Sequence, residues 1–334
     1  MDRGNAALVL GATGGIGGEV TRRLRDAGWK VRALRRSEAN ADGRTDGVTW
    51  IRGDAMNGRD VANAAAGCSV IVHAVNPPGY RRWPELVLPM LDNSIAAATV
   101  SGATVVLPGT IYNFGPDAFP VLTEDSPQRP QSRKGAIRVE MERRLRQASQ
   151  QGARVLIVRA GDFFGPNAGN NWFSQGLVKP GTPVTTVRNP TTPGVGHLWA
   201  YLPDVAQTML ELIQRRESLP GFATFHMAGH WDADGSQMAS AVRQVVARRT
   251  GRRPRVTAFP WWFLTLAAPL VATFREMREM RYPWREPIRM DNARLIQALG
   301  REPHTPLNEA VEATLAGLGC LDVPVGSEVP VAGA

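Results

Sequence analysis

Two cationic side chains in the middle of the chain, Lys134 and Arg138, are four residues apart, which places them on one face of a helix. Only three of the 39 basic residues are lysines, so a lysine here is unusual for this chain. A lysine amine releases a proton when burial or neighbouring cations disfavour its charge, whereas a guanidinium keeps its proton. The sequence therefore predicts Lys134 as a proton-transfer group beside the fixed cation Arg138. The alternative is a solvated helix end.

Two hydroxyl groups, Thr110 and Tyr112, follow a short apolar stretch and are candidates for the same site. A hydroxyl both donates and accepts hydrogen bonds, so it can orient a substrate oxygen or exchange a proton. Their other interpretation is loop packing. We expect the catalytic group to consist of Lys134, Arg138, Thr110 and Tyr112.

A glycine-rich stretch stands between a short apolar run, Ala6 to Leu10, and a segment with helical periodicity, Glu19 to Ala27. Its glycines repeat at three-residue spacing, as in loops that bind dinucleotides between a strand and a helix. Such glycines permit a tight turn, close approach of a pyrophosphate and close helix packing, and the helix N-terminus attracts the phosphates. The predicted phosphate contacts are Gly11, Thr13, Gly14, Gly15, Ile16 and Gly17.

The end of the second apolar run, Lys30 to Leu34, indicates which nucleotide is bound. A carboxylate about 20 residues past the loop would bind a ribose 2′-hydroxyl and repel a 2′-phosphate. Here the sequence has Arg35 and Arg36, which can form charge-assisted hydrogen bonds to a phosphate. NADP(H) is therefore the predicted cofactor. The alternative is that both arginines are only solvated surface residues.

Apolar runs alternate with helical segments through the first half of the chain, which predicts a parallel, doubly wound sheet of the Rossmann type in an α/β protein. The helices are clearest at residues 84–101 and 135–150. The predicted strands are 6–10, 30–34, 48–52, 69–74, 104–107 and 153–159.

Together these stretches resemble the extended short-chain dehydrogenase/reductases, the group of NAD-dependent epimerases and dehydratases. The resemblance runs through Gly53-Asp54, His73 to Asn76, Arg159 to Pro166, Tyr201 to Ala206 and Phe225 to Ala228. It implies that Asp54 binds the adenine amino group and that residues 74–76 line the nicotinamide ribose. Beyond the glycine loop and the two arginines, the cofactor contacts implied are Asp54, Ala55, Ala74, Val75, Asn76, Lys134, Ala160, Gly161 and Phe163.

The chain departs from this family at the active-site helix. Where the family has Tyr-x-x-x-Lys, this sequence has Lys134 and Arg138, and Pro108 stands at the usual serine position. The spacing is similar to that of isoflavone-reductase-like, atypical members, which are NADPH-dependent and use a lysine at this point. Two explanations stay open: Lys134 has taken over proton transfer, or catalysis has been lost and the protein is an NADP(H) sensor.

The second half of the chain is expected to provide a smaller C-terminal substrate domain, as the resemblance implies. The expected division is 1–166 with about 197–228 for the nucleotide, 167–196 and 229–321 for the substrate, and 322–334 as a tail. Asp162 stands where epimerases of sugar nucleotides usually have Asn, which disfavours a diphosphate. The aromatic residues of the second half favour an uncharged, hydrophobic or aromatic substrate. The predicted pocket wall is Pro78, Asp162, Asn171, Trp172, His197, Trp199 and Tyr201.

The most apolar run, residues 259–274, contains two prolines and is too short to span a bilayer. We expect a buried helix there, with weak contact to a membrane surface as the alternative. The net charge of +9 comes from arginines spread along the chain, which argues against a nucleic-acid site. We expect no metal site, a cytoplasmic location and, from the resemblance, a homodimer.

These observations predict an NADPH-dependent reductase that transfers hydride to a carbonyl or a conjugated C=C bond, with Lys134 as the proton donor. The alternatives are a non-catalytic NADP(H) sensor and a sugar-nucleotide epimerase or dehydratase.

Overall fold

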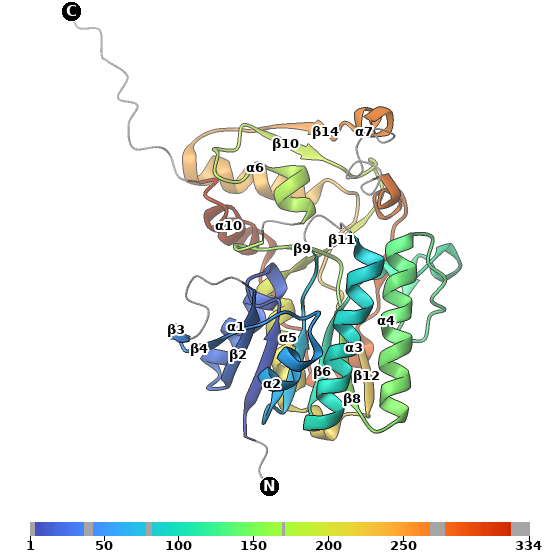
Figure 1. The fold of residues 1–334 in the computed structure, drawn as a ribbon. Coiled ribbons are helices and arrows are strands. Elements are labelled where there is room, and N and C mark those ends of the chain that lie inside the picture. Colours follow the sequence, from blue (N-terminus) through green and yellow to red (C-terminus); the bar gives the residue numbers. More distant parts are fainter. Residues whose placement is uncertain (1–3, 37–42, 78–81, 169–170, 268–277, 322–334) are drawn as a thin grey trace, which may run out of the picture.

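In the computed structural model, residues 4–36, 43–77, 82–168, 171–267 and 278–321 are described. They contain an eight-stranded sheet in the order β12-β8-β6-β5-β1-β2-β4-β3 (Figure 1). Neighbouring strands pair in parallel, except that β3 runs antiparallel to β4. The strands are β1 (Ala6–Leu10), β2 (Lys30–Arg35), β3 (Gly43–Thr45), β4 (Val48–Arg52), β5 (Val70–His73), β6 (Thr104–Gly109), β8 (Arg154–Arg159) and β12 (Phe222–His226).

The predicted α/β fold with a parallel sheet is confirmed, and the six predicted strands lie within two residues of observed ones. The sequence did not identify β3 or β12 as strands of this sheet. β12 adds to the edge formed by β8, more than sixty residues earlier in the chain, so no local pattern links the two.

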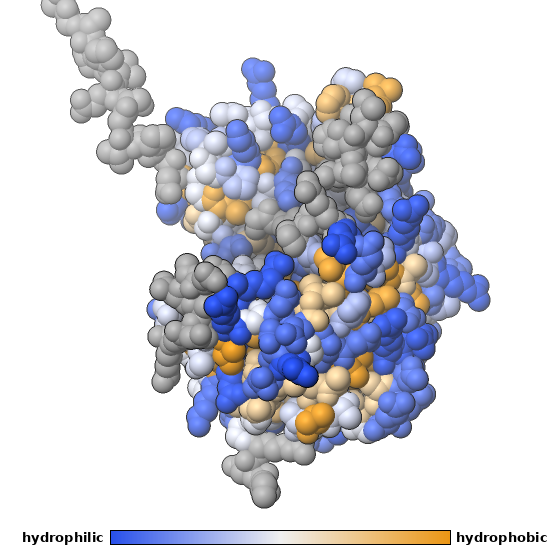
Figure 2. All heavy atoms as spheres, in the orientation of Figure 1, coloured by the Kyte–Doolittle hydropathy of each residue, from blue (hydrophilic) through white to orange (hydrophobic). Residues whose placement is uncertain are grey.

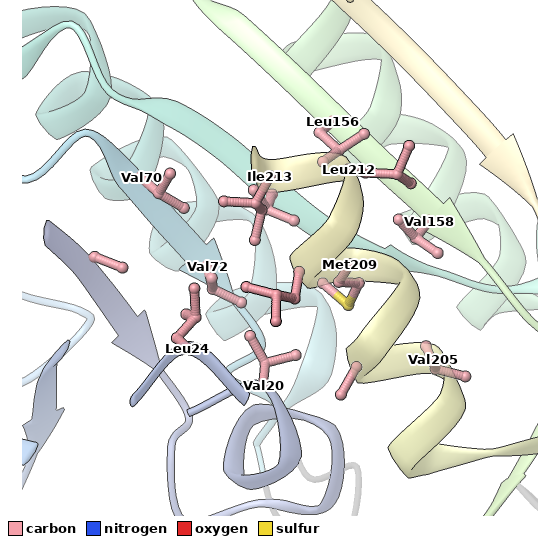
Figure 3. Packing of buried hydrophobic residues seen from close by; sticks show 14 of the residues in the cluster. Val20, Leu24, Val70, Val72, Leu156, Val158, Val205, Met209, Leu212 and Ile213 are labelled. Atoms are coloured by element: carbon pink, nitrogen blue, oxygen red, sulfur yellow. The ribbon is translucent and has the colours of Figure 1, made fainter. Parts of the chain in front are cut away.

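Helices cover both faces of the sheet. On one face lie α1 (Gly15–Asp26) and α5 (Leu202–Gln214), and on the other lie α2 (Gly58–Ala65), α3 (Trp83–Ser101) and α4 (Arg133–Gln150). Figure 3 shows the first layer, where Met209 and Ile213 of α5 face the strand residues Val72 and Val158. All four are at most 1% exposed, and each such buried side chain contributes roughly 1.5–3 kcal/mol. This packing fixes the strand ends that carry the candidate site.

A second group of elements lies beyond the carboxyl ends of the parallel strands, at the end of the sheet away from the N-terminus (Figure 1). It has its own apolar cluster, in which Phe164, Phe173 and Trp199 are buried. Its elements and their neighbours are β7 (Val121–Leu122), β9 (Asp162–Phe164), β10 (Thr186–Asn189), β11 (His197–Tyr201), β13 (His230–Asp232), β14 (Arg255–Ala258), β15 (Arg289–Met290), α6 (Gln237–Thr250), α7 (Trp261–Ala267) and α10 (Leu307–Gly317). Helix α9 (Ala293–Leu299) packs instead on α5 and β12 of the main sheet.

The expected buried helix over residues 259–274 is wrong for the part that the structure describes. Helix α7 is short, and Trp262, Phe263 and Leu266 are 69%, 48% and 72% exposed. Two side chains hold this helix to the rest of the structure: Leu264 is buried, and the Trp261 indole donates to the Pro190 carbonyl. Apolar side chains therefore gather at the surface over α7 (Figure 2). Among the described helices, none has the length and apolarity needed to cross a membrane.

Candidate functional site

A cavity of about 1090 Å³ crosses the carboxyl ends of β1, β2, β5 and β6. It brings together the predicted catalytic residues and all the residues predicted to contact a cofactor except Gly17, which is not on its wall. The predicted cofactor contacts on its wall are Gly11, Thr13, Gly14, Gly15, Ile16, Arg35, Arg36, Asp54, Ala55, Ala74, Val75, Asn76, Lys134, Ala160, Gly161 and Phe163.

The glycine loop needs its glycines for three different reasons. Gly11 has a φ of +87°, and a Cβ there would lie 2.5 Å from the Ala74 carbonyl oxygen. A Cβ on Gly17 would collide with the Gly11 carbonyl oxygen, so α1 can pack onto the loop only without a side chain. Gly14, at the N-terminus of α1, meets only its own loop and leaves the cavity side open. The loop therefore fits an anionic group held by backbone amides and the helix dipole.

The end of the cavity next to β2 is cationic. Arg35 and Arg36 line it at the end of β2, and the Arg35 guanidinium lies 4.8 Å from the centre of the Trp50 ring. Asp54 lines the same end and accepts a hydrogen bond from the amide of Met56 at 3.0 Å. Two guanidinium groups at this position fit a phosphate better than a bare ribose.

The opposite end of the cavity is formed by the start of α4 and the loop after β6. The hydroxyl of Ser132 caps α4 by accepting the amide of Gly135 at 3.0 Å. A Cβ on Gly135 would collide with the Tyr112 carbonyl oxygen, so helix and loop are in close contact. This contact places Lys134, which is 7% exposed, on the same cavity wall as Tyr112.

Arg138 and Thr110 complete this end of the cavity. Arg138 follows Lys134 by one helical turn, lines the cavity and lies over the Trp83 ring at 5.3 Å. Thr110 lines it from the end of β6. The structure thus brings together the four residues predicted to be catalytic.

Of the predicted substrate residues, Asp162, Asn171 and Trp172 line the cavity, and Pro78 lies outside the described residues. The placement of His197, Trp199 and Tyr201 on the pocket wall is wrong. All three lie on β11, between β9 and β13, where both faces of the strand are covered. Burial also raises the pKa of Tyr201 to about 12.

His197 nevertheless contacts Asp162, a residue of the cavity wall. Its Nε2 lies 3.0 Å from Oδ2 of Asp162, and Oδ1 of Asp162 accepts the Tyr112 hydroxyl at 2.7 Å. The ring of His197 stacks on Trp284 with a centroid separation of 3.6 Å.

The sequence did not reveal a buried ion pair under the site. Arg159, 1% exposed, donates to a carboxylate oxygen of Glu142 at 2.9 Å and to the Thr110 carbonyl at 2.6 Å. An arginine that ends an apolar strand was the available signal, because a buried guanidinium requires a partner. This pair fixes the loop that carries Thr110.

His73, at the end of β5, is neutral in this setting. Burial, aided by the nearby Arg138 cation, lowers its pKa to about 3. Its Nδ1 lies 2.8 Å from the Ser94 hydroxyl. Because the imidazole is neutral, His73 adds no charge to the cavity wall. Among the described residues, no three His, Cys, Asp or Glu side chains come together as a metal site.

Residues 11–172 match the model of a protein family described as NAD(P)H-binding. A search of curated protein sequences gave no match.

Solved structures with the same fold include MoeE5 in complex with UDP-glucose and NAD, with 19% identity, a TM-score of 0.68, and coverage of 94% of this chain and 98% of that one. WbmH of Bordetella bronchiseptica in complex with NAD+ has 17% identity, a TM-score of 0.66 and coverage of 94% and 97%. UDP-glucose 4-epimerase of Bifidobacterium longum, in complex with NAD+ and UDP, has 14% identity, a TM-score of 0.67 and coverage of 93% and 97%.

The match and the glycine-loop geometry agree, since the matched residues include the loop and most of the cavity wall. Residues 11–172 are therefore similar to an NAD(P)H-binding family, and the chain has the same fold as these NAD-bound structures.

Proposed function

We propose that this protein is an NADPH-dependent reductase of a small, largely apolar carbonyl or enone compound. The observation that carries the proposal is the continuity of the cavity. It connects Arg35 and Arg36 at one end with Lys134 and Tyr112 at the other, past the glycine loop. A cofactor with an extra phosphate at one end and a reactive ring at the other fits this arrangement.

Different residues of the cavity would bind different parts of the cofactor. The amides at the start of α1 would hold the pyrophosphate, and Arg35 and Arg36 would hold the 2′-phosphate. When bound, NADPH supplies the hydride. Lys134, or a water molecule that it holds, would give the proton to the developing oxyanion or carbanion. The fixed positive charge of Arg138 would promote release of that proton from the Lys134 ammonium group.

The remaining wall at the reactive end is mainly apolar. Ile111, Trp172 and Met280 line it, and Trp172 is held in an aromatic cluster with Phe259, Trp261 and Trp284. Such a surface supports a substrate with a hydrophobic or aromatic body.

The test is NADPH oxidation in the presence of ketones, quinones and enones, with Lys134→Met compared to Lys30→Met. Lys30 is an exposed lysine on β2 and serves as the matched control. Loss of turnover in Lys134→Met only, with NADPH affinity retained, supports the proposal. Equal turnover in both variants removes Lys134 from the mechanism. Tight binding without turnover by the wild type, with different affinities for NADP+ and NADPH, would favour a sensor.

A second candidate function is epimerisation or dehydration of a sugar nucleotide. It is favoured by two of the solved structures, MoeE5 and the Bifidobacterium epimerase, which are complexes with UDP-glucose or UDP together with NAD or NAD+. Against it stands Asp162, a carboxyl group on the cavity wall. Retention of NAD through purification, together with conversion of UDP-glucose, would support this candidate over the reductase.

A further inference from the structure

The short helix α7 presents large apolar side chains to solvent. Trp262 and Leu266, four residues apart and therefore on one face of the helix, are 69% and 72% exposed. The side toward the protein is held by buried Leu264 and by the bond from the Trp261 indole to the Pro190 carbonyl. A surface helix ordinarily exposes a charged or polar face, whereas no residue of α7 is charged. The exposed face of α7 thus fits an apolar partner.

Next to α7 lies the two-stranded sheet of β10 and β14, whose outer face is cationic. The two strands pair in parallel, with Thr186 opposite Arg255. Side chains alternate along a strand, so Arg188 shares a face with Arg255, and both are exposed. The sheet adjoins the helix, because the amide of Phe259 donates to the Asn189 carbonyl at 2.8 Å just before α7 begins.

The positive charge of this region is not balanced by nearby acidic residues in the sequence. Residues 235–275 include seven arginines and no Asp or Glu. Two of these arginines, on α6, pair with Glu312 of α10. Within the described part of the chain, neither Arg188 nor Arg255 forms an ion pair with a carboxylate. An apolar helix and a cationic sheet therefore lie next to each other.

A phospholipid bilayer with anionic headgroups is complementary to both features. Tryptophan and leucine side chains bury their apolar parts at the boundary of headgroups and acyl chains, and arginines attract the negative headgroups. A second copy of this chain fits less well, because an isologous contact would set the same arginines against each other. In Figure 2 the apolar side chains over α7 and hydrophilic ones over β10 share the end of the molecule away from the N-terminus.

The exposed helix is also connected to the wall of the candidate site. Trp261 of α7 packs against Trp172, with ring centroids 5.6 Å apart, and Trp172 lines the cavity. The Arg281 guanidinium lies over the other side chain of this pair, 5.1 Å from the centre of the Trp261 ring, and its neighbour Met280 lines the cavity too. A surface that binds α7 would therefore lie one aromatic contact away from the cavity wall.

We propose that α7 and the outer face of β10 and β14 form a docking surface for anionic phospholipid membranes. Trp262 and Leu266 enter the headgroup region, while Arg188 and Arg255 contact the headgroups. Delivery of an apolar substrate from the bilayer to the cavity would rest on the function proposed above. The lipid contact itself does not, because it depends only on the surface of the protein.

Flotation of the protein with vesicles tests the lipid contact. The vesicles contain phosphatidylcholine alone, or phosphatidylcholine with an equal part of phosphatidylserine. We expect binding to the anionic vesicles in about 0.1 M NaCl and its loss in about 1 M NaCl, where the Debye length falls from about 10 Å to about 3 Å. Trp262→Ser should weaken binding about tenfold, since one apolar side chain is no longer buried. Its control is Val100→Ser, which changes an exposed apolar residue on α3.

The arginines are tested by combining Arg188→Gln with Arg255→Gln. Each arginine near an anionic surface strengthens binding by about fivefold, so the double variant should bind about twentyfold more weakly. The control with the same change of net charge combines Arg59→Gln with Arg143→Gln, exposed arginines on α2 and α4. It should bind nearly as the wild type does. Unchanged urea unfolding midpoints show that the variants are folded.

Absence of binding to the anionic vesicles, or equal binding to both kinds, would overturn the inference. Binding that neither Trp262→Ser nor the double arginine variant weakens would overturn it as well. A dimer that Trp262→Ser dissociates, without vesicle binding, would assign α7 to a contact with a second copy instead. Flotation needs no turnover, so failure of the reductase proposal would leave the lipid contact standing.

Discussion

Replacement of Glu142 by Gln should destabilise the whole protein, although this residue lies beneath the cavity and not in it. Its carboxylate accepts hydrogen bonds from Arg159, Asn113 and Gln128. A glutamine keeps the shape but loses the charge, and its amide nitrogen takes the place of one acceptor. At least one of the three donors then faces another donor, and the Arg159 guanidinium is left buried without a counter-ion.

The size of the effect follows from the geometry. Unit charges 2.9 Å apart attract each other by about 6 kcal/mol at an effective dielectric constant of about 20. The two side chains are 1% and 8% exposed, so water replaces little of that attraction. Removal of one partner of such a buried pair typically destabilises a protein by about 3–5 kcal/mol. We expect Glu142→Gln to fall in that range.

The assay is urea unfolding followed by tryptophan fluorescence, with Glu140→Gln as the matched control on the same helix. Glu140 pairs with Arg143 and Arg144, and these pairs are partly exposed to solvent. The control should leave the unfolding midpoint nearly unchanged, because exposed ion pairs add little stability. Similar midpoints for the two variants would refute the argument that the Arg159 pair holds the loop of Thr110 in place.

Three further predictions concern other parts of the molecule. Gly17→Ala should abolish nucleotide binding, measured by fluorescence titration, because its Cβ collides with the loop, whereas Gly4→Ala, which has open space, should not. His73 and His226 have pKa values lowered to about 3, so the unfolded chain gains protons first as the pH falls below 6.5. Stability should thus be full above that pH and fall by about 2 kcal/mol for each at pH 5, measured by urea unfolding, with a smaller fall in His73→Gln. If exposed α7 contacts membrane surfaces, Trp262→Ser should reduce cosedimentation with vesicles of phosphatidylserine and phosphatidylcholine; equal cosedimentation of the two proteins would contradict that role.

The parts of the fold that the sequence predicted well are those with local causes. The glycine spacing predicts the turn between β1 and α1 because the positive φ of Gly11 and the close contact of Gly17 with Gly11 both arise within the loop. Apolar runs predict the parallel strands because both faces of such strands are buried. The cavity wall from Gly11 to Lys134 then follows, since parallel strands end at one edge of the sheet.

The parts that it predicted poorly depend on contacts between distant residues. The aromatic character of Trp199 and Tyr201 did not reveal that β9 and β13 enclose β11. The pairing of Arg159 with Glu142 depends on how α4 lies against β8. The exposure of Trp262 and Leu266 on α7 depends on where this helix lies in the tertiary structure, which composition does not reveal.

The cofactor assignment is tested by a fluorescence titration of the protein with NADPH and NADH, repeated with Arg35→Asp. We predict tighter binding of NADPH by the wild type, because Arg35 and Arg36 line the end of the cavity where a 2′-phosphate would lie. The carboxylate that the substitution introduces should invert that preference, since it repels a 2′-phosphate and accepts from a ribose 2′-hydroxyl. Equal affinities for both nucleotides in both proteins would contradict the cofactor assignment, and failure to bind either nucleotide would contradict the proposed function as a whole.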